Sequence, residues 1–453
     1  MSDGARTSFL ERVGLGRREL RAWAMYDWAN SAVMTTVIAA VFPPYFQGVA
    51  AAGLPERLAF SRFGVATSIA VIFIGIMSPI LGALADFAAV KKRMLGAFMI
   101  LGAAATAGMF FIQQGDWQIA IGLFMVVNIG IAGSIVFYDA LLPHIAKQGE
   151  LDRASTAGYG LGYLGGGVLL ALNLAWILSP GTFGLPSGDD IGPAAATLPV
   201  RLALLSAAIW WVLFSIPLFR RVPEPPRRLE ADETMTENAT RAALARLAET
   251  FRHLRGYKYA FLMLLAVLIY GDGITTIIRM ATIYGAEIGI AREALIAAIL
   301  ITQLVGAPFA FLFGALAGRI GAKTAILAGL VVYMGITIVG YFMTTATHFL
   351  LLAALVGMVQ GGTQALSRSL FARLIPRHKS GEFYGFFGVM NRFAGSIGTL
   401  AMALITAMTG SPRHGILAII LFFIIGALVL MRVDVAAGER AARQAEVEAG
   451  VVT

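Results

Sequence analysis

Ionisable side chains interrupt apolar stretches that are otherwise long enough to cross a bilayer. Asp27, Asp272, Arg279 and Arg392 each lie inside such a stretch, and Asp139 lies at the end of another. An ionisable group inside a membrane span costs about 2.5–3.5 kcal/mol on insertion scales and therefore marks a candidate functional site. A carboxylate there can take up and release a proton, because loss of hydration favours its neutral form. An arginine stays protonated and offers a fixed positive charge to a carboxylate substrate.

Polar side chains follow these charges at helical spacing. Asn30 lies three residues after Asp27, and Asp272 is followed by Thr276 and Arg279. The same kind of spacing gives two further sets, which are Gln360 with Gln364 and Arg392 with Ser396. Such stripes indicate a polar pathway for substrate or protons through an apolar bundle. Polar side chains also hydrogen-bond membrane helices to one another, so both interpretations stay open.

The elements that position these residues follow from composition. The 453 residues are 58% hydrophobic and 13% charged, with a mean hydropathy of +0.77, whereas soluble domains carry roughly 25% charged residues. A span needs about 20 mainly apolar residues. The sequence has twelve such runs, at 23–46, 60–85, 93–113, 117–141, 156–178, 200–219, 259–284, 293–317, 323–344, 348–371, 383–409 and 412–432. We therefore predict an all-α membrane protein with twelve transmembrane helices.

The distribution of Lys and Arg predicts the orientation. Of the 35 basic residues, the loops on one side hold only five, which are Arg57, Arg62, Arg201, Arg292 and Arg413. Since cytoplasmic loops are rich in Lys and Arg, both termini are expected in the cytoplasm. The net charge of +9 is then a topology signal, and we expect no nucleic-acid partner. Compact loops favour a bacterial inner membrane, with a eukaryotic organelle as the alternative.

The domain prediction has five parts. They are a cytoplasmic N-terminal segment (1–22), a six-helix bundle (23–219), a cytoplasmic linker (220–256), a second six-helix bundle (257–432) and a cytoplasmic tail (433–453). In the linker, Leu244, Leu247, Phe251 and Leu254 recur at helical spacing among arginines, which predicts an amphipathic helix on the anionic leaflet. The tail is expected to be solvated and mobile.

The two bundles carry traces of a repeat. The block from Gly82 to Lys91 and the block from Gly314 to Lys323 share five identities at an offset of 232, and Pro143 and Pro376 are 233 residues apart. Both pairs fall in loops six helices apart. Parallel six-helix repeats are one established transporter architecture, so we predict two pseudo-symmetric bundles.

The first block resembles the loop between the second and third helices of the major facilitator superfamily. The family pattern has Gly and Asp where this chain has Gly82 and Asp86, but Phe87, Ala89 and Val90 depart from it. The resemblance implies a major-facilitator-type fold in which the Asp closes the cytoplasmic side through charge pairs and a neighbouring helix N-terminus. The gating residues it implies are Gly82, Asp86, Lys91, Arg93 and Arg319.

A more specific resemblance covers nearly the whole chain. The segments Tyr26–Ser31, Tyr270–Gly273 and Gln360–Ser369 resemble the vacuole-effluxer (autophagy-related efflux permease-like) branch. The superfamily resemblance implies that helices 1, 4, 7 and 10 line a central cavity and that helices 3, 6, 9 and 12 face lipid. The positions of the charges agree, because these last four helices have no charged residue in their interiors.

Other chemistries are excluded by the sequence. The absence of cysteine rules out disulfides, thiolate metal sites and cysteine nucleophiles. The five histidines are scattered without ligand spacing, so we expect no metal site. No nucleophile motif is present, and an enzyme is not expected. We expect no cofactor, with the proton as the candidate coupling ion.

These observations predict a secondary active transporter of small polar solutes that works by alternating access, is proton-coupled and exports amino acids. We expect a monomer whose partners are a small-molecule substrate and the lipid bilayer. A proton-coupled exporter of drugs or other small organic molecules is the alternative within transport. A non-transporting membrane scaffold or sensor is the alternative from another class.

Overall fold

The computed structural model describes residues 8–188, 191–227, 239–252, 256–287 and 289–450, and the regular elements within these ranges are all helices. Twelve segments of the described chain are helices long and apolar enough to cross a membrane. We number them spans 1 to 12: Arg18–Ala50, Glu56–Ala88, Lys91–Phe111, Trp117–Ile145, Leu151–Leu178, Leu198–Arg221, Lys258–Ala281, Ala294–Ile320, Ala322–Tyr341, Ala346–Arg373, Arg377–Thr409 and Arg413–Met431. The predicted all-α fold with twelve spans is confirmed.

Spans 1 to 6 form the N-terminal half. Span 1 is irregular, since π-helical turns interrupt it, and its parts are α2 (Arg18–Val33), η1 (Met34–Val41), α3 (Phe42–Tyr45) and η2 (Phe46–Ala50). The other main helices are α4 (Glu56–Ala88), α5 (Lys91–Gly108), α6 (Trp117–Ile145), α7 (Leu151–Leu178) and α9 (Leu198–Arg221). Helices suit these apolar segments because every backbone polar group is paired within the helix.

Spans 7 to 12 form the C-terminal half. Its unbroken helices are α11 (Lys258–Glu287), α12 (Arg292–Ile320), α13 (Ala322–Tyr341) and α14 (Ala346–Arg373). Span 11 is divided into α15 (Ser380–Phe393) and α16 (Ser396–Thr409), and span 12 into α17 (Pro412–Ala418) and α18 (Ile420–Met431). The remaining short elements of the chain are α1 (Phe9–Arg12), η3 (Met109–Phe111), η4 (Pro180–Phe183), α8 (Pro193–Ala196) and η5 (Arg377–Lys379).

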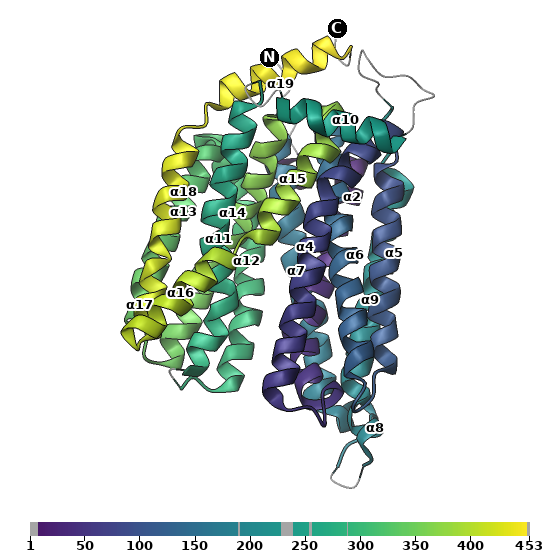
Figure 1. The fold of residues 1–453 in the computed structure, drawn as a ribbon, viewed down its shortest axis with the longest axis vertical. Helices are drawn as coiled ribbons and strands as arrows, with labels where there is room; N and C mark the ends of the chain where they lie inside the picture. Colours follow the sequence, from purple (N-terminus) through teal and green to yellow (C-terminus); the bar gives the residue numbers. More distant parts are fainter. Residues whose placement is uncertain (1–7, 189–190, 228–238, 253–255, 288, 451–453) are drawn as a thin grey trace.

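Both ends of the chain lie at the same end of the molecule, which we call the termini end (Figure 1). Two further helices cover it, α10 (Ala239–Arg252) in the linker and α19 (Val435–Glu448) in the tail. The linker therefore contains a helix where we predicted one, and it packs on α4 with Leu247 buried and Leu244 exposed. Leu254 lies outside the described residues.

The C-terminal tail is not the solvated segment that we expected. Asp434 caps α19, and the helix lies against α11 and α14, with Gly438, Ala442 and Glu446 buried. The Glu446 carboxylate accepts a hydrogen bond from the Arg377 backbone N–H at 2.9 Å. The tail was expected to be solvated because its hydropathy is low. The groups that hold it lie on other helices, so the sequence of the tail itself does not reveal them.

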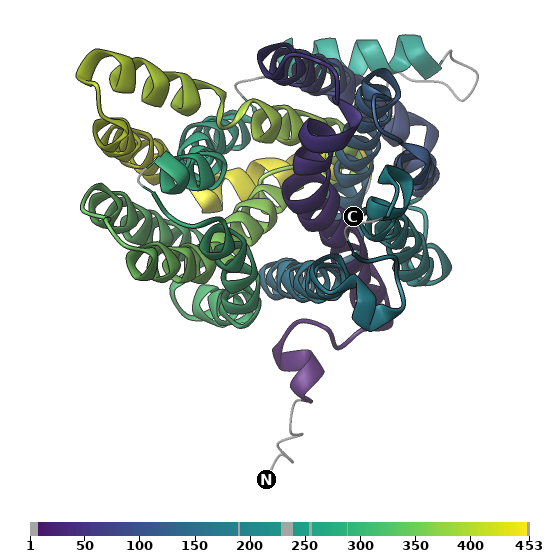
Figure 2. The ribbon, with the colours of Figure 1, turned by 90° about the horizontal axis from the view of Figure 1, so that it is seen from below.

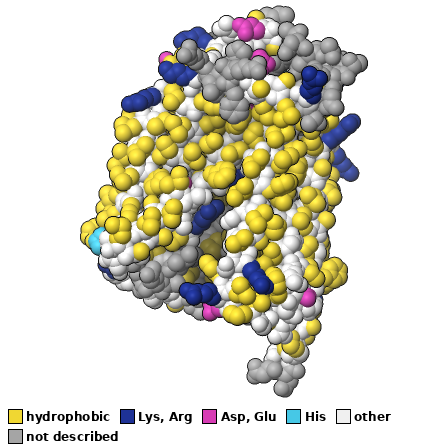
Figure 3. All heavy atoms as spheres, viewed as in Figure 1, with side chains coloured by type: hydrophobic (Ala, Val, Ile, Leu, Met, Phe, Trp, Pro, Cys, Tyr) yellow, Lys and Arg dark blue, Asp and Glu magenta, His cyan; other side chains and the backbone are white. Residues whose placement is uncertain are grey.

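The two halves stand side by side (Figures 1 and 2). Helices α4, α6 and α7 of the first half contact α12, α14 and α15 of the second. The hydrogen bonds and ion pairs between halves concentrate toward the termini end, as described below. Toward the other end the space-filling surface is hollowed between the halves (Figure 3).

Candidate functional site

A buried arginine joins the two halves. Arg368 lies on α14, and its side chain is 3% exposed. Its Nη2 is 3.2 Å from Oδ2 of Asp27 on α2, and its Nη1 is 3.1 Å from Oδ1 of Asp139 on α6. Its Nε donates to the Ser155 hydroxyl on α7 at 2.9 Å. One side chain of the C-terminal half thus binds three helices of the N-terminal half.

Aromatic rings enclose the same guanidinium. Its central carbon lies 4.7 Å from the ring centroid of Trp23 and 4.6 Å from that of Tyr159. The Tyr138 hydroxyl donates to Oδ2 of Asp27 at 2.8 Å. Ring faces attract a cation, and the hydroxyl fixes the carboxylate. We call Arg368, Asp27, Asp139, Ser155 and Tyr138 the central network.

A second ionic contact between the halves lies closer to the termini end. Arg373 on α14 is 2.5 Å from Asp152, in the first turn of α7. The Ser369 hydroxyl donates to the same carboxylate at 2.7 Å. Arg373 also lies 3.6 Å from Glu439 on α19. The tail helix is therefore connected to the contact between α7 and α14.

A third contact joins α4 to the start of α15. The Asp86 carboxylate accepts the backbone N–H groups of Gly381 and Glu382 at 3.0 and 2.8 Å, and it lies 2.5 Å from Nζ of Lys91. A Cβ at Gly82 would overlap the Gly381 carbonyl oxygen. Only glycine at position 82 permits this approach, which lets Asp86 satisfy the free amides at a helix N-terminus.

Asp272 binds the second piece of span 11. The side chain, on α11, accepts the backbone N–H of Gly398 at 2.5 Å and that of Ile397 at 3.2 Å. The Thr276 hydroxyl lies 3.4 Å from the same carboxylate. Asp272 is 1% exposed. The two pieces of span 11 therefore each have an aspartate from another helix at their N-terminus.

Comparison with known proteins shows what kind of molecule this network belongs to. A family model described as "Vacuole effluxer Atg22 like" matches residues 15–443. The chain belongs to this family. The uncharacterized MFS-type transporter YxiO of Bacillus subtilis is 35% identical over 91% of this chain and 94% of its own length. Autophagy-related protein 22 of Yarrowia lipolytica is 25% identical over 65% of this chain, and the match spans 52%, about half, of that longer relative.

The fold agrees with this membership. The crystal structure of the major facilitator superfamily transporter FucP in the outward conformation is similar to this chain with a TM-score of 0.69 at 15% identity, over 92% of this chain and 100% of that one. The resemblance to the superfamily and to its Atg22-like branch is thereby confirmed. The chain is a multi-pass secondary transporter of the major facilitator superfamily, and it is not an enzyme.

For this family member, the predicted pathway residues fall into three groups. Asp27 belongs to the central network and the buried Asn30 follows it on α2, while Asp272, Thr276 and Arg279 follow one another along α11. Three further residues predicted for the pathway are half-buried in the second half, and they are Gln360, Gln364 and Arg392. Their role in the pathway stays a prediction.

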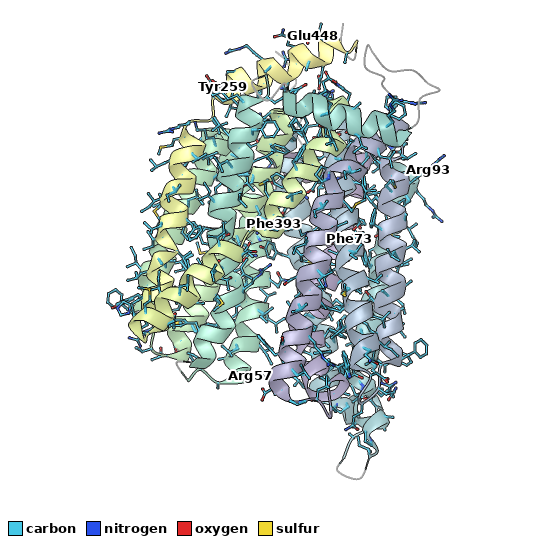
Figure 4. All side chains as sticks on the ribbon, in the orientation of Figure 1. Arg57, Phe73, Arg93, Tyr259, Phe393 and Glu448 are labelled. Carbon is cyan, nitrogen blue, oxygen red and sulfur yellow. The ribbon has the colours of Figure 1, made fainter. Side chains whose placement is uncertain are left out.

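The predicted gating residues also separate. Gly82, Asp86 and Lys91 meet at the start of α15. Arg93 and Arg319 are exposed instead, and Arg93 points away from α5 at the outer surface (Figure 4). The neighbouring Lys92 makes the inward contacts, donating its Nζ to the carbonyl oxygen of Val222 at 2.8 Å. A helix has one inward face, and at the start of α5 Lys91 and Lys92 occupy it.

Sequence reasoning missed Arg368 because it lies near a loop and was counted among the basic flanks. The stripe of Gln360 and Gln364 continues at the same spacing of four to Arg368, and this was the signal that could have found it. Asp139 was noticed as a charge but had no partner in the sequence. The pair of Asp152 and Arg373, 221 positions apart, carried no local signal.

Proposed function

We propose that this transporter exports small polar solutes, amino acids among them, by proton-coupled alternating access. It would act as a monomer in the bacterial cytoplasmic membrane, with both termini in the cytoplasm. The observation that carries the proposal is the position of Arg368 between Asp27 and Asp139, at the interface between the halves. This interface must open if a site between the halves is to become accessible from the termini end.

The charges of the central network support the proposal that transport is coupled to protons. Arg368 supplies one positive charge, and Asp27 and Asp139 supply two negative charges when both are ionised. In a buried place the surplus charge is expensive unless one carboxylate binds a proton. A proton on either carboxylate also weakens its attraction to Arg368, because the ion pair becomes an ordinary hydrogen bond. Protonation would therefore favour separation of the halves at this end.

Two arginines support the proposal that the substrate carries a carboxylate. Arg279 is exposed although it lies within span 7, and Arg392 is half-buried near the break in span 11. An exposed arginine within a span is favoured only where it meets water or an anion rather than lipid. Together with the amide side chains of Gln360 and Gln364, they provide groups that bind carboxylate and polar groups.

The orientation follows from the loop charges. Cytoplasmic loops carry the excess of Lys and Arg, and the basic loops of this chain lie on the same side as the termini. The closed termini end would then face the cytoplasm, and the hollow of Figure 3 would face outward. Export agrees with the family description, which names an effluxer, and a bacterial membrane agrees with the relative from Bacillus subtilis.

The test uses purified protein in liposomes. A panel of amino acids, small carboxylates and cationic drugs is first screened by thermal stabilisation. Flux of the hits is then measured with and without an imposed pH gradient, and also as counterflow of labelled against unlabelled substrate. We expect gradient-driven flux of an amino-acid hit in the wild type. Asp27→Asn or Asp139→Asn should remove the dependence on the gradient while counterflow persists in at least one of the two variants.

Asp116→Asn is the matched control, because Asp116 accepts a backbone hydrogen bond from Gln113 in a loop at the opposite end. It should leave both kinds of flux unchanged. Full gradient dependence in both the Asp27 and the Asp139 variant would show that these carboxylates do not carry the coupling proton. Stabilisation by a ligand with no flux under any gradient would favour a sensor over a transporter.

A further inference from the structure

Span 11 is broken in the middle of the apolar region. Helix α15 ends at Phe393, and α16 begins at Ser396. Ala394 between them has ψ 137°, and Gly395 has φ 85°, in the left-handed region that favours glycine. A Cβ at position 395 would lie 2.6 Å from Cγ2 of Thr275 on α11. Both the backbone conformation and the neighbouring helix therefore require glycine here.

Such a break leaves backbone amides without partners, because the first N–H groups of a helix have no intrahelical acceptor. Within a membrane these groups must be satisfied by protein. The Asp272 carboxylate does this for Ile397 and Gly398, and its charge also complements the positive end of α16. Gly398 makes room for it, since a Cβ there would lie 2.5 Å from Oδ1 of Asp272.

The two pieces of span 11 differ in whether they contact the N-terminal half of the molecule. Helix α15 lies against α4 and α6 of the N-terminal half as well as against α11 of its own half, and Asp86 of α4 holds its N-terminus. Helix α16 lies against α11 and α17, in its own half, and Asp272 of α11 holds its N-terminus. Its outer face, which includes Leu400 and Leu404, is exposed. The break thus separates a piece bound across the interface from a piece bound within one half.

We propose that span 11 works as two bodies, with Gly395 as the hinge and Asp272 as the residue that anchors α16 to the C-terminal half. When the termini end opens, α15 leaves α4 while α16 keeps its place beside α11. Asp272 is then a positioning residue for α16.

The experiment measures distances between spin labels in nanodiscs. The chain has no cysteine, so paired cysteine substitutions can be labelled uniquely. Val331 on α13 serves as the reference in the C-terminal half, because it is exposed there. Asn391, exposed near the end of α15, and Leu404, exposed on α16, report the two pieces. The two pairs are Val331 with Asn391 and Val331 with Leu404.

Each aspartate variant should release one piece only. Asp272→Asn exchanges one acceptor oxygen for an NH₂ group that faces a backbone N–H. The distribution of distances from Val331 to Leu404 should therefore broaden and shift. The distance from Val331 to Asn391 should stay near its wild-type value. Asp86→Asn should do the reverse. Asp434→Asn is the matched control, because Asp434 caps the surface helix α19 in the same way. This control should leave both distances unchanged.

Two results would overturn the proposal. An unchanged distance from Val331 to Leu404 in Asp272→Asn would show that Asp272 does not anchor α16. Parallel shifts of both pairs in Asp86→Asn would show that span 11 moves as one body. Transport gives an independent check, since Asp272→Asn should lower gradient-driven flux and counterflow by the same factor. Loss of gradient-driven flux with full counterflow would instead make Asp272 a proton carrier.

Discussion

Arg368 and Asp27 are 341 positions apart in the chain, yet Nη2 of the arginine lies 3.2 Å from Oδ2 of the aspartate. The contact crosses the boundary between the two six-helix halves and is enclosed by aromatic rings. Two more contacts, Arg373 with Asp152 and Asp86 with the start of α15, cross the same boundary closer to the termini end. The termini end is therefore closed by charged groups that are largely buried, and their separation is a required step in any cycle of alternating access.

Removal of the central cation should be severe. Arg368→Gln leaves the Asp27 and Asp139 carboxylates buried with a neutral partner, and breaking one side of a buried ion pair costs about 3–5 kcal/mol. We expect a large fall in melting temperature and loss of transport. Arg368→Lys keeps the charge but cannot reproduce the separate contacts of Nη1, Nη2 and Nε. It should restore part of the stability and little of the flux, as measured by thermal unfolding and vesicle transport.

Gly82→Leu should force the termini end open. The added side chain would overlap the Gly381 backbone, so α4 and α15 have to separate. A cysteine at Ser380, which is fully buried in this contact, should become reactive toward a water-soluble maleimide, and transport should stop. Gly335→Leu is the control, because a Cβ at Gly335 meets nothing within 4 Å. Equal protection of the cysteine in both variants would contradict this account of Gly82.

The tail helix should contribute to stability. The buried Glu446 carboxylate accepts the Arg377 backbone N–H, and a hydrogen bond to a charged group contributes about 1.5–3 kcal/mol. Glu446→Gln should lower the melting temperature of the purified protein. Glu448→Gln, at an exposed position two residues further along, should have little effect. If both variants unfold like the wild type, the attachment of α19 does not depend on Glu446.

An acid-sensitive contact ties the N-terminal segment to the loop between spans 4 and 5. Burial acts to raise the pKa of Glu150, but the Lys147 backbone N–H and the Arg17 guanidinium outweigh it and lower that pKa below its usual value. A carboxyl group with a lowered pKa stabilises the folded state above its ordinary pKa. This stabilisation is lost as the pH falls through the lowered value. Glu150→Gln should therefore reduce the acid dependence of the melting temperature, with the wild type measured from neutral pH down to pH about 3.

Much of the architecture could be predicted from the sequence. Runs of apolar residues set the twelve spans, because each residue's preference for lipid or water is a local property that adds along a helix. The excess of basic residues in alternate loops gave the expected orientation. Asp27 and Asp272 were found for the same reason, since a charge in an apolar run is conspicuous without any knowledge of its partner.

The pairings were decided by tertiary structure alone. In the sequence, Arg368 lies near a loop and resembles the other basic residues that flank the spans. The packing of α14 on α6 and α7 places it between two carboxylates. Span 11 was predicted as one apolar run over 383–409. Hydropathy carries no information about the positive φ at Gly395 or about the acceptor that Asp272 provides from another helix. Local composition determines which segments enter the membrane. Which buried charges meet depends on how whole helices pack, and that packing brings together residues that no local pattern relates.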